Sequence, residues 1–106
     1  MATMEQIEEL GRRIGREFRP DRVILFGSHA RGAAGSDSDV DLLVILPFEG
    51  KAPYKSAEIR MKARATFPVD LIVRTPDKVL ERLEMGDCFM REILEEGKVL
   101  YEADRG

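Results

Sequence analysis

The chain has 106 residues, of which 43% are apolar and 35% are charged; this composition is typical of a folded globular protein, and we expect one domain over residues 1–106. Its 17 Lys and Arg residues against 20 Asp and Glu residues give a net charge of −3, which argues against direct nucleic-acid binding through a broad basic face. Cys88 is the only cysteine, so no disulfide within the chain is expected. The N-terminal segment is acidic, unlike a signal peptide, and no apolar run approaches the ~20 residues that span a bilayer. We therefore predict a cytoplasmic protein without a membrane partner.

The first half of the chain predicts one long helix and two strands. Apolar residues recur every three or four positions over residues 4–18 and predict an amphipathic helix that ends before Pro20. The β-branched run "RVILF" at 22–26 predicts a strand stopped by Gly27, after which Ser28 is expected to cap a short helix. Residues 39–46, "DVDLLVIL", are apolar on both faces beyond the acids and predict an interior strand.

The second half continues the alternation of helix and strand. After a loop at 47–53, residues 54–67 predict a helix closed by Pro68, and "VDLIVR" at 69–74 predicts a third strand. Thr75 and Asp87 are expected to cap two further helices, which end at Gly86 and Gly97, and residues 98–102 form a candidate edge strand. The chain is therefore predicted to be α/β (α+β), with a small mixed sheet of three to four strands flanked by helices.

Two aspartates at the start of the 39–46 strand need an explanation. Side chains alternate along a strand, so Asp39 and Asp41 point to the same face, with backbones roughly 6–7 Å apart. Asp70 lies one residue inside the 69–74 strand, and if the two strands are neighbours the three carboxylates converge. Mutual repulsion then calls for a compensating cation, Mg²⁺ above all, whereas the alternative is that each Asp is a separate turn or cap residue.

Two better-known motifs that this region partly matches fail on spacing. "DSDVDLLVILPF" begins like a calcium-binding EF-hand loop, but it has Leu42 rather than glycine at its sixth position and Phe48 rather than glutamate at its twelfth. "GSHARGAA" has the glycine spacing of a P-loop, but Ala33 and Ala34 occupy the places of the required lysine and serine or threonine.

The segment after the first strand has the composition of a phosphate-binding turn. Gly27 allows a phosphate to approach the backbone, Ser28 offers a hydroxyl, and a helix start offers free N–H groups. Arg31 follows within one turn and its guanidinium suits phosphate oxygens. His29, the only histidine, is expected to be an exposed loop residue without a catalytic role.

At this point the sequence resembles a known family. Gly27-Ser28, then Asp39-Val40-Asp41-Leu42, then Asp70 on a later strand resemble the signature of the DNA polymerase beta-like nucleotidyltransferase superfamily. More narrowly, "GSHARG" and "SDVDLLV" with the ending "FMREILEEGKVLYE" resemble the minimal nucleotidyltransferases, single-domain proteins often encoded beside a HEPN-domain protein. The resemblance covers nearly the whole chain and implies the polymerase beta-like nucleotidyltransferase fold.

The resemblance also implies a role for each carboxylate. Asp39 and Asp41 would bridge two Mg²⁺ ions, with Mn²⁺ as an alternative metal. Asp70 would complete the second metal site and help to activate the acceptor hydroxyl, either as a ligand or as a base. All three would be catalytic residues as well as metal ligands, in a two-metal displacement at the α-phosphorus of ATP with pyrophosphate as the leaving group.

The same resemblance implies a nucleotide-binding set. Gly27 and Ser28 would hold the terminal phosphates of ATP. Arg31 would either contact a phosphate or brace the loop through carbonyl groups. Ser38 would cap or orient Asp39 on the nucleotide-binding side, and Asp37 would be solvated.

Partners follow from the resemblance too. Larger superfamily members have a second domain that binds the acceptor. This chain is expected to have no room for such a domain, so a partner chain in a hetero-oligomer would supply the acceptor. In the toxin–antitoxin pairs that the chain resembles, the nucleotidyltransferase is the antitoxin and AMPylates a tyrosine on a HEPN toxin. The alternatives are a non-catalytic, nucleotide-binding antitoxin that blocks its partner sterically, and an enzyme that acts on a small molecule or an RNA end. Phe89 and Met90 are candidates either for that interface or for the core.

Overall fold

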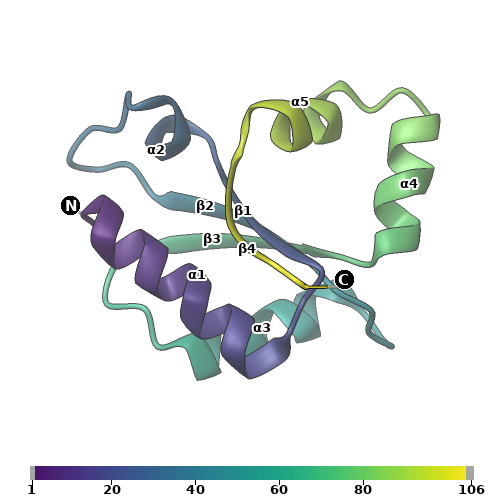
Figure 1. The fold of residues 1–106 in the computed structure, drawn as a ribbon, viewed down its shortest axis with the longest axis horizontal. Helices are drawn as coiled ribbons and strands as arrows, with labels where there is room; N and C mark the ends of the chain where they lie inside the picture. The colour runs from purple at the N-terminus through teal and green to yellow at the C-terminus, as the bar shows by residue number, and fades with distance from the viewer. Residues whose placement is uncertain (1, 105–106) are drawn as a thin grey trace.

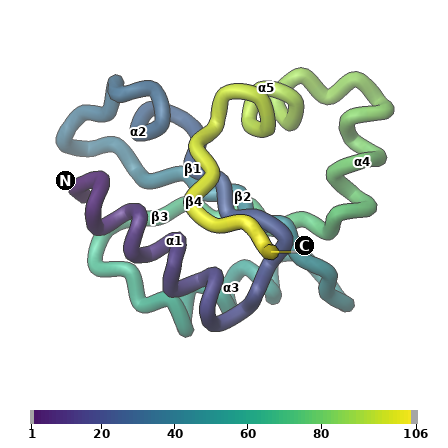
Figure 2. The backbone as a smooth tube through the Cα atoms, in the orientation of Figure 1, coloured from purple at the N-terminus to yellow at the C-terminus, as the bar shows by residue number. Residues whose placement is uncertain are grey.

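The computed structural model describes residues 2–104 and is built on a mixed sheet of four strands in the order β3-β2-β1-β4 (Figures 1 and 2). β2 pairs antiparallel with β1 and parallel with β3, while β4 pairs antiparallel with the other side of β1. The strands are β1 (Arg22–Phe26), β2 (Val40–Ile45), β3 (Val69–Arg74) and β4 (Lys98–Glu102). The predicted fold class is confirmed, and so are the interior position of β2 and the edge position of β4.

Helices cover both faces of the sheet. α1 and α3 lie on one face, α4 and α5 lie on the other, and the short α2 follows the end of β1 (Figure 1). Within residues 2–104, no helix is both long and apolar enough to cross a membrane. The helices are α1 (Met4–Phe18), α2 (Ser28–Arg31), α3 (Ala52–Ala63), α4 (Pro76–Glu84) and α5 (Cys88–Glu96).

Local capping explains most of these boundaries, and it corrects one of them. Thr75 and Asp87 accept hydrogen bonds from the third residues of α4 and α5, as predicted. The helix predicted over residues 54–67 instead begins at Ala52 and ends at Ala63. Pro53 fits the first turn because its missing N–H would be free there in any case, and Arg64 stops the helix in a left-handed conformation with φ of 51°.

Alternation along the strands separates the core into two parts. Val40, Leu42 and Val44 of β2 are buried in the cluster beneath α1 and α3. Leu43 and Ile45 are buried in a second cluster, on the face that α4 and α5 cover. The residue that precedes Leu43 on this second face is Asp41, so a carboxylate lies at the end of an otherwise apolar row.

Candidate active site

Two of the predicted carboxylates are neighbours across the parallel pair of strands. Asp41 of β2 and Asp70 of β3 are register partners, and on its other side Asp41 is paired with Phe26 at the end of β1. Adjacent strands lie about 4.8 Å apart, so the two acids start from neighbouring backbone positions on one face. Asp39 is exposed one residue before β2 begins. The parallel pairing is what brings Asp70 to the start of β2.

The electrostatics of Asp41 reflect this crowding. Burial raises the pKa of the Asp41 carboxyl above its ordinary range, and the negative charges of Asp70 and then Asp39 raise the pKa further. His29 and Arg31 act in the opposite direction, more weakly. Three acids and two basic side chains are therefore close enough to influence one another at this end of the sheet.

The carboxylates are close together but are not already arranged as a ligand set. Among the described residues, no group of three or more His, Cys, Asp or Glu side chains is placed so that it could hold a metal ion. The chemistry of the donors nevertheless fits a hard divalent cation, since all three offer carboxylate oxygens. Metal binding at Asp39, Asp41 and Asp70 therefore stays a prediction.

Gly27 connects the predicted phosphate turn to these acids. It has φ of 77° and ψ of −155°, a conformation that residues with a side chain rarely adopt. A Cβ atom at this position would collide with Oδ2 of Asp41. Gly27 of "FGS" therefore lies against Asp41 of "DVD", and only glycine fits at position 27.

The short helix after Gly27 differs from the prediction in two respects. Gly27, not Ser28, is the residue that caps α2, and Ser28 is its first helical residue. His29 is buried, with 8% of its surface exposed, so the prediction of an exposed loop residue was wrong. Its Nε2 lies 3.3 Å from the carbonyl oxygen of Ser38, which ties α2 to the loop that leads into Asp39.

Ser38 shapes this loop through bonds to Gly35. Its hydroxyl accepts a hydrogen bond of 3.0 Å from the Gly35 N–H, and its own N–H donates to the Gly35 carbonyl at 3.2 Å. Its expected role in capping or orienting Asp39 and its contact with nucleotide stay predictions. Arg31 is exposed, and its backbone N–H donates to the Gly27 carbonyl at 3.2 Å.

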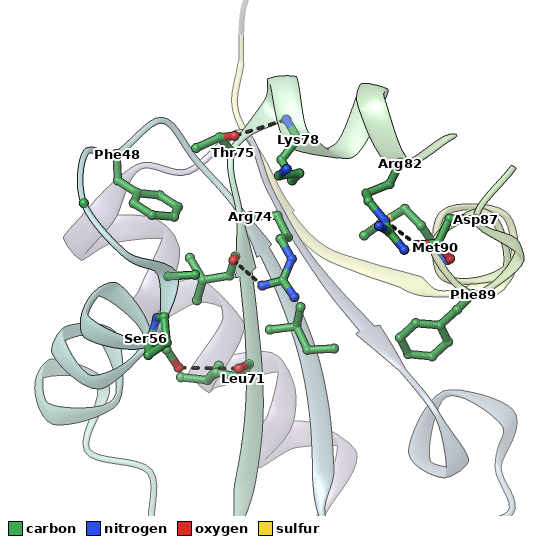
Figure 3. Close-up of a pocket in the computed structure, with 15 residues that line it drawn as sticks. Phe48, Ser56, Leu71, Arg74, Thr75, Lys78, Arg82, Asp87, Phe89 and Met90 are labelled. Carbon is green, nitrogen blue, oxygen red and sulfur yellow. Dashed lines mark hydrogen bonds and ion pairs between the residues drawn. The ribbon is translucent and has the colours of Figure 1, made fainter. Parts of the chain in front are cut away.

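Two hollows open near these strands. The smaller, of about 210 Å³, has Gly27, Arg31 and Asp41 in its wall, together with residues of α5. The larger, of about 960 Å³, opens over β3 between α3, α4 and α5 (Figure 3). The basic residues that line this hollow were not predicted from the sequence. The signal that could have indicated Arg74 is the alternation along "VDLIVR", which places Arg74 on the same face as Asp70.

Phe89 separates the two hollows, because its ring lines both of them. The ring packs edge-on against Phe26, with centroids 5.7 Å apart and planes at 81°. Phe89 keeps 54% of its surface exposed, whereas its neighbour Met90 is a core residue. The core alternative is thus confirmed for Met90, whereas an interface role for Phe89 stays a prediction.

Comparison with known proteins identifies related sequences over most of the chain. Residues 4–101 match the family described as nucleotidyltransferase domain. Two similar proteins are candidate protein adenylyltransferases of Methanocaldococcus jannaschii. One is 31% identical over 84 residues, which are 78% of this chain and 80% of the relative. The other is 38% identical over 53 residues, and the chain spans only 54% of its length.

Solved structures show the same fold at lower identity. A candidate nucleotidyltransferase from Sulfolobus solfataricus superposes with a TM-score of 0.59 at 20% identity, over 96% of this chain and 82% of that one. A toxin–antitoxin crystal structure with AMP-PNP gives a TM-score of 0.57 at 18% identity, over 92% and 75% of the two chains. At these identities the likeness establishes the fold alone.

Proposed function

The chain belongs to the nucleotidyltransferase domain family, and from this premise we propose that it transfers AMP from ATP to a hydroxyl group of a partner protein. The observation that supports this most directly is the position of Asp41, beside Asp70 on the next strand and against the α-carbon of Gly27. The acids that would bind a cation and the turn that would bind phosphate are neighbours there, which suits a metal–nucleotide substrate. The protein adenylyltransferase names of the two archaeal relatives support a protein as the acceptor.

The carboxylates would bind the divalent cations of the reaction. Asp39, Asp41 and Asp70 would hold two Mg²⁺ ions, with Mn²⁺ as the alternative, because such ions take carboxylate oxygens as ligands. When bound, the ions supply positive charge to the attacking and departing oxygens. The raised pKa of Asp41 supports this assignment, since its causes, burial and repulsion by Asp70 and Asp39, are relieved by a cation.

The turn around Gly27 would position the nucleotide. Gly27 admits a phosphate close to the backbone, Ser28 offers its hydroxyl, and Arg31 either contacts a phosphate or braces the loop that Ser38 shapes. The acceptor oxygen attacks the α-phosphorus and forms a new P–O bond, while the bond from this phosphorus to the oxygen bridging it to the β-phosphate breaks and pyrophosphate leaves. The hydroxyl proton passes to Asp70 if this residue is the base, and otherwise to solvent.

For the biological partner we propose a HEPN-domain toxin encoded nearby. The chain would act as the antitoxin of the pair, form a hetero-oligomer with the toxin in the cytoplasm and AMPylate one of its tyrosines. The support is the resemblance of "GSHARG" and "SDVDLLV" to the minimal nucleotidyltransferases, together with the shared fold of the toxin–antitoxin structure. The free, exposed Cys88 fits a reducing compartment.

One observation favours a second candidate function. Since the described carboxylates are not already arranged as a three-ligand metal site, a non-catalytic antitoxin that binds nucleotide and blocks its partner sterically is the alternative. Both candidates use the nucleotide turn, but only the enzyme needs all three acids. Substitution of the acids therefore separates them.

The experiment is intact mass measurement of the partner protein after incubation with the chain, ATP and Mg²⁺. We expect a gain of one or more AMP units that Asp39→Asn or Asp70→Asn abolishes. Asp37→Asn is the matched control, because Asp37 is an exposed acid of the same loop without a role in the mechanism. No gain in mass, with protection from toxicity retained by both variants, would favour the steric antitoxin.

A further inference from the structure

The larger hollow, which we call the β3 cleft, opens along β3 from Leu71 to Arg74, directly after Asp70 in the strand. It is lined by segments of α3, β3, α4 and α5 and by the loop around Phe48. Asp70, Ile72 and Arg74 alternate onto the same face of β3, and the last two line the cleft. Asp70 is therefore the next residue on this face after Ile72, and it lies on the side of Asp41 away from Phe26 and Gly27.

The charge of the β3 cleft is opposite to that of the chain. The whole chain has a net charge of −3. The charged residues that line the cleft are three cations, Arg74, Lys78 and Arg82, and one acid, Asp87. Lys78 is paired with Glu81 at 3.4 Å, and both side chains are at least half exposed, whereas Arg82 is paired at 2.9 Å with Asp87, whose side chain is 15% exposed. An exposed ion pair such as Lys78–Glu81 stabilises the fold little, so Lys78 can exchange its partner for an incoming carboxylate.

Arg74 is the cation nearest to the floor of the cleft. Its guanidinium donates to the carbonyl oxygen of Val73 at 2.8 Å, a neutral acceptor on its own strand. Figure 3 shows Arg74 near the middle of the cleft, with the aromatic ring of Phe48 on one side of it and that of Phe89 on the other. A ligand in the cleft would therefore meet positive charge and apolar surface together.

Two backbone carbonyl groups of β3 already have side-chain partners. The carbonyl oxygen of Leu71 accepts a bond from the Ser56 hydroxyl at 3.4 Å, and that of Val73 accepts the bond from Arg74. Occupied edge groups disfavour strand addition, the usual way in which an extended peptide binds to a sheet edge. We therefore expect binding in the cleft to use side chains of the ligand rather than strand pairing.

We propose that the β3 cleft is the docking site of the acceptor, an acidic segment of the partner protein that presents a tyrosine hydroxyl to Asp70. The identity of the occupant as an acceptor rests on the proposed function. A nucleotide seated at Gly27 approaches the aspartate pair from the smaller hollow, which leaves the larger one for the second substrate. The local excess of positive charge selects acidic flanking residues.

The test separates docking from transfer. Two fluorescein-labelled peptides with a central tyrosine, one flanked by Asp and Glu and the other by Lys and Arg, are titrated with the full chain without nucleotide, and anisotropy is recorded. We expect the acidic peptide to bind at least about tenfold more tightly, and Lys78→Glu to reduce its affinity by a similar factor. Arg74→Gln, which introduces no new charge, should act in the same direction.

Lys62→Glu is the matched control. Lys62 is a half-exposed lysine that is paired with a glutamate of its own helix, as Lys78 is, but it lies outside the cleft. Equal affinity for the two peptides, or an equal loss with Lys62→Glu and Lys78→Glu, would overturn the proposal. Weaker binding of Mg²⁺–ATP by Lys78→Glu and Arg74→Gln would also overturn it, because the cleft would then hold the nucleotide. Binding of the acidic peptide, with no gain of AMP by the partner protein in the mass measurement described above, would support docking while refuting the proposed function.

Discussion

The two faces of the sheet differ in how they use neighbouring residues of β2. On the face beneath α1 and α3, Val40, Leu42 and Val44 are buried in an uncharged cluster. On the other face, Asp41 lies between two of these residues in sequence and is crowded by like charges. The packing of Val40, Leu42 and Val44 beneath α1 and α3 stabilises the position of β2. The protein can therefore keep the Asp41 carboxylate on the opposite face, although its ionisation is disfavoured there.

The largest expected effect is that of Asp41→Asn on activity. The substitution removes the charge but preserves the shape, and we expect AMP transfer to fall by about 1000-fold, the scale of losing a group that stabilises the transition state. Folding stability should stay the same or rise, because repulsion from Asp70 and Asp39 disappears. Initial rates and urea unfolding measure the two effects, and a stable fold with undiminished transfer would remove Asp41 from the site.

Leu42→Ala tests the other face at the adjacent position. Leu42 is completely buried, so truncation leaves a cavity and should lower the free energy of unfolding by about 2–5 kcal/mol. Transfer by the fraction that stays folded should be nearly normal, because the carboxylates belong to the opposite face. Calorimetry with activity per folded molecule separates the contributions. A specific activity as low as that of Asp41→Asn would show that the two faces are not independent.

A smaller effect is expected at the contact between the turn and the acids. Gly27→Ala adds a Cβ that meets Oδ2 of Asp41 in a backbone conformation that alanine adopts poorly, at a cost of about 1–3 kcal/mol. Nucleotide affinity should fall as well. Gly35→Ala is the control, since a Cβ there meets nothing within 4 Å. Similar affinities for the two variants would show that this contact is not part of the nucleotide site.

The smallest effect concerns pH. The folded protein holds the Asp41 proton more tightly than the unfolded chain does, because the pKa is raised. Stability should therefore fall as pH rises from the ordinary Asp range through the raised pKa, and should remain lower above it. Asp41→Asn should flatten this part of the profile, whereas Asp37→Asn should not. Urea unfolding at a series of pH values measures it, and identical wild-type and Asp41→Asn profiles would contradict the electrostatic account.

Local signals in the sequence were sufficient for most of the fold. The runs at 22–26 and 69–74 became β1 and β3 with their predicted bounds, because β-branched residues between glycine and proline signals leave few alternatives. α3 was displaced because its ends depend on Pro53 and on the left-handed Arg64, rather than on a clear apolar pattern. Strand alternation predicted that Asp39 and Asp41 share one face of the sheet. In the structure, Asp41 lies on the same face as Leu43 and Ile45, and Asp39 precedes the strand.

The parts of the site that were missed depend on contacts between distant segments. Burial of His29 requires the Ser38 carbonyl and could not be inferred from the polar run around it. The neighbourhood of Asp41 and Asp70 depends on strand order, for which the sequence allowed only a conditional statement. The β3 cleft is assembled from helices and a strand that are far apart along the chain, so its basic lining became visible only in the structure.

The central claim is that Gly27, Asp41 and Asp70 form one metal–nucleotide site. The most direct test is Mn²⁺ binding measured by electron paramagnetic resonance, with and without a non-hydrolysable ATP analogue, for the wild type and for Asp41→Asn. The account predicts that the nucleotide tightens Mn²⁺ binding to the wild-type chain and that Asp41→Asn abolishes this linkage. Equal linkage in the two proteins would contradict it.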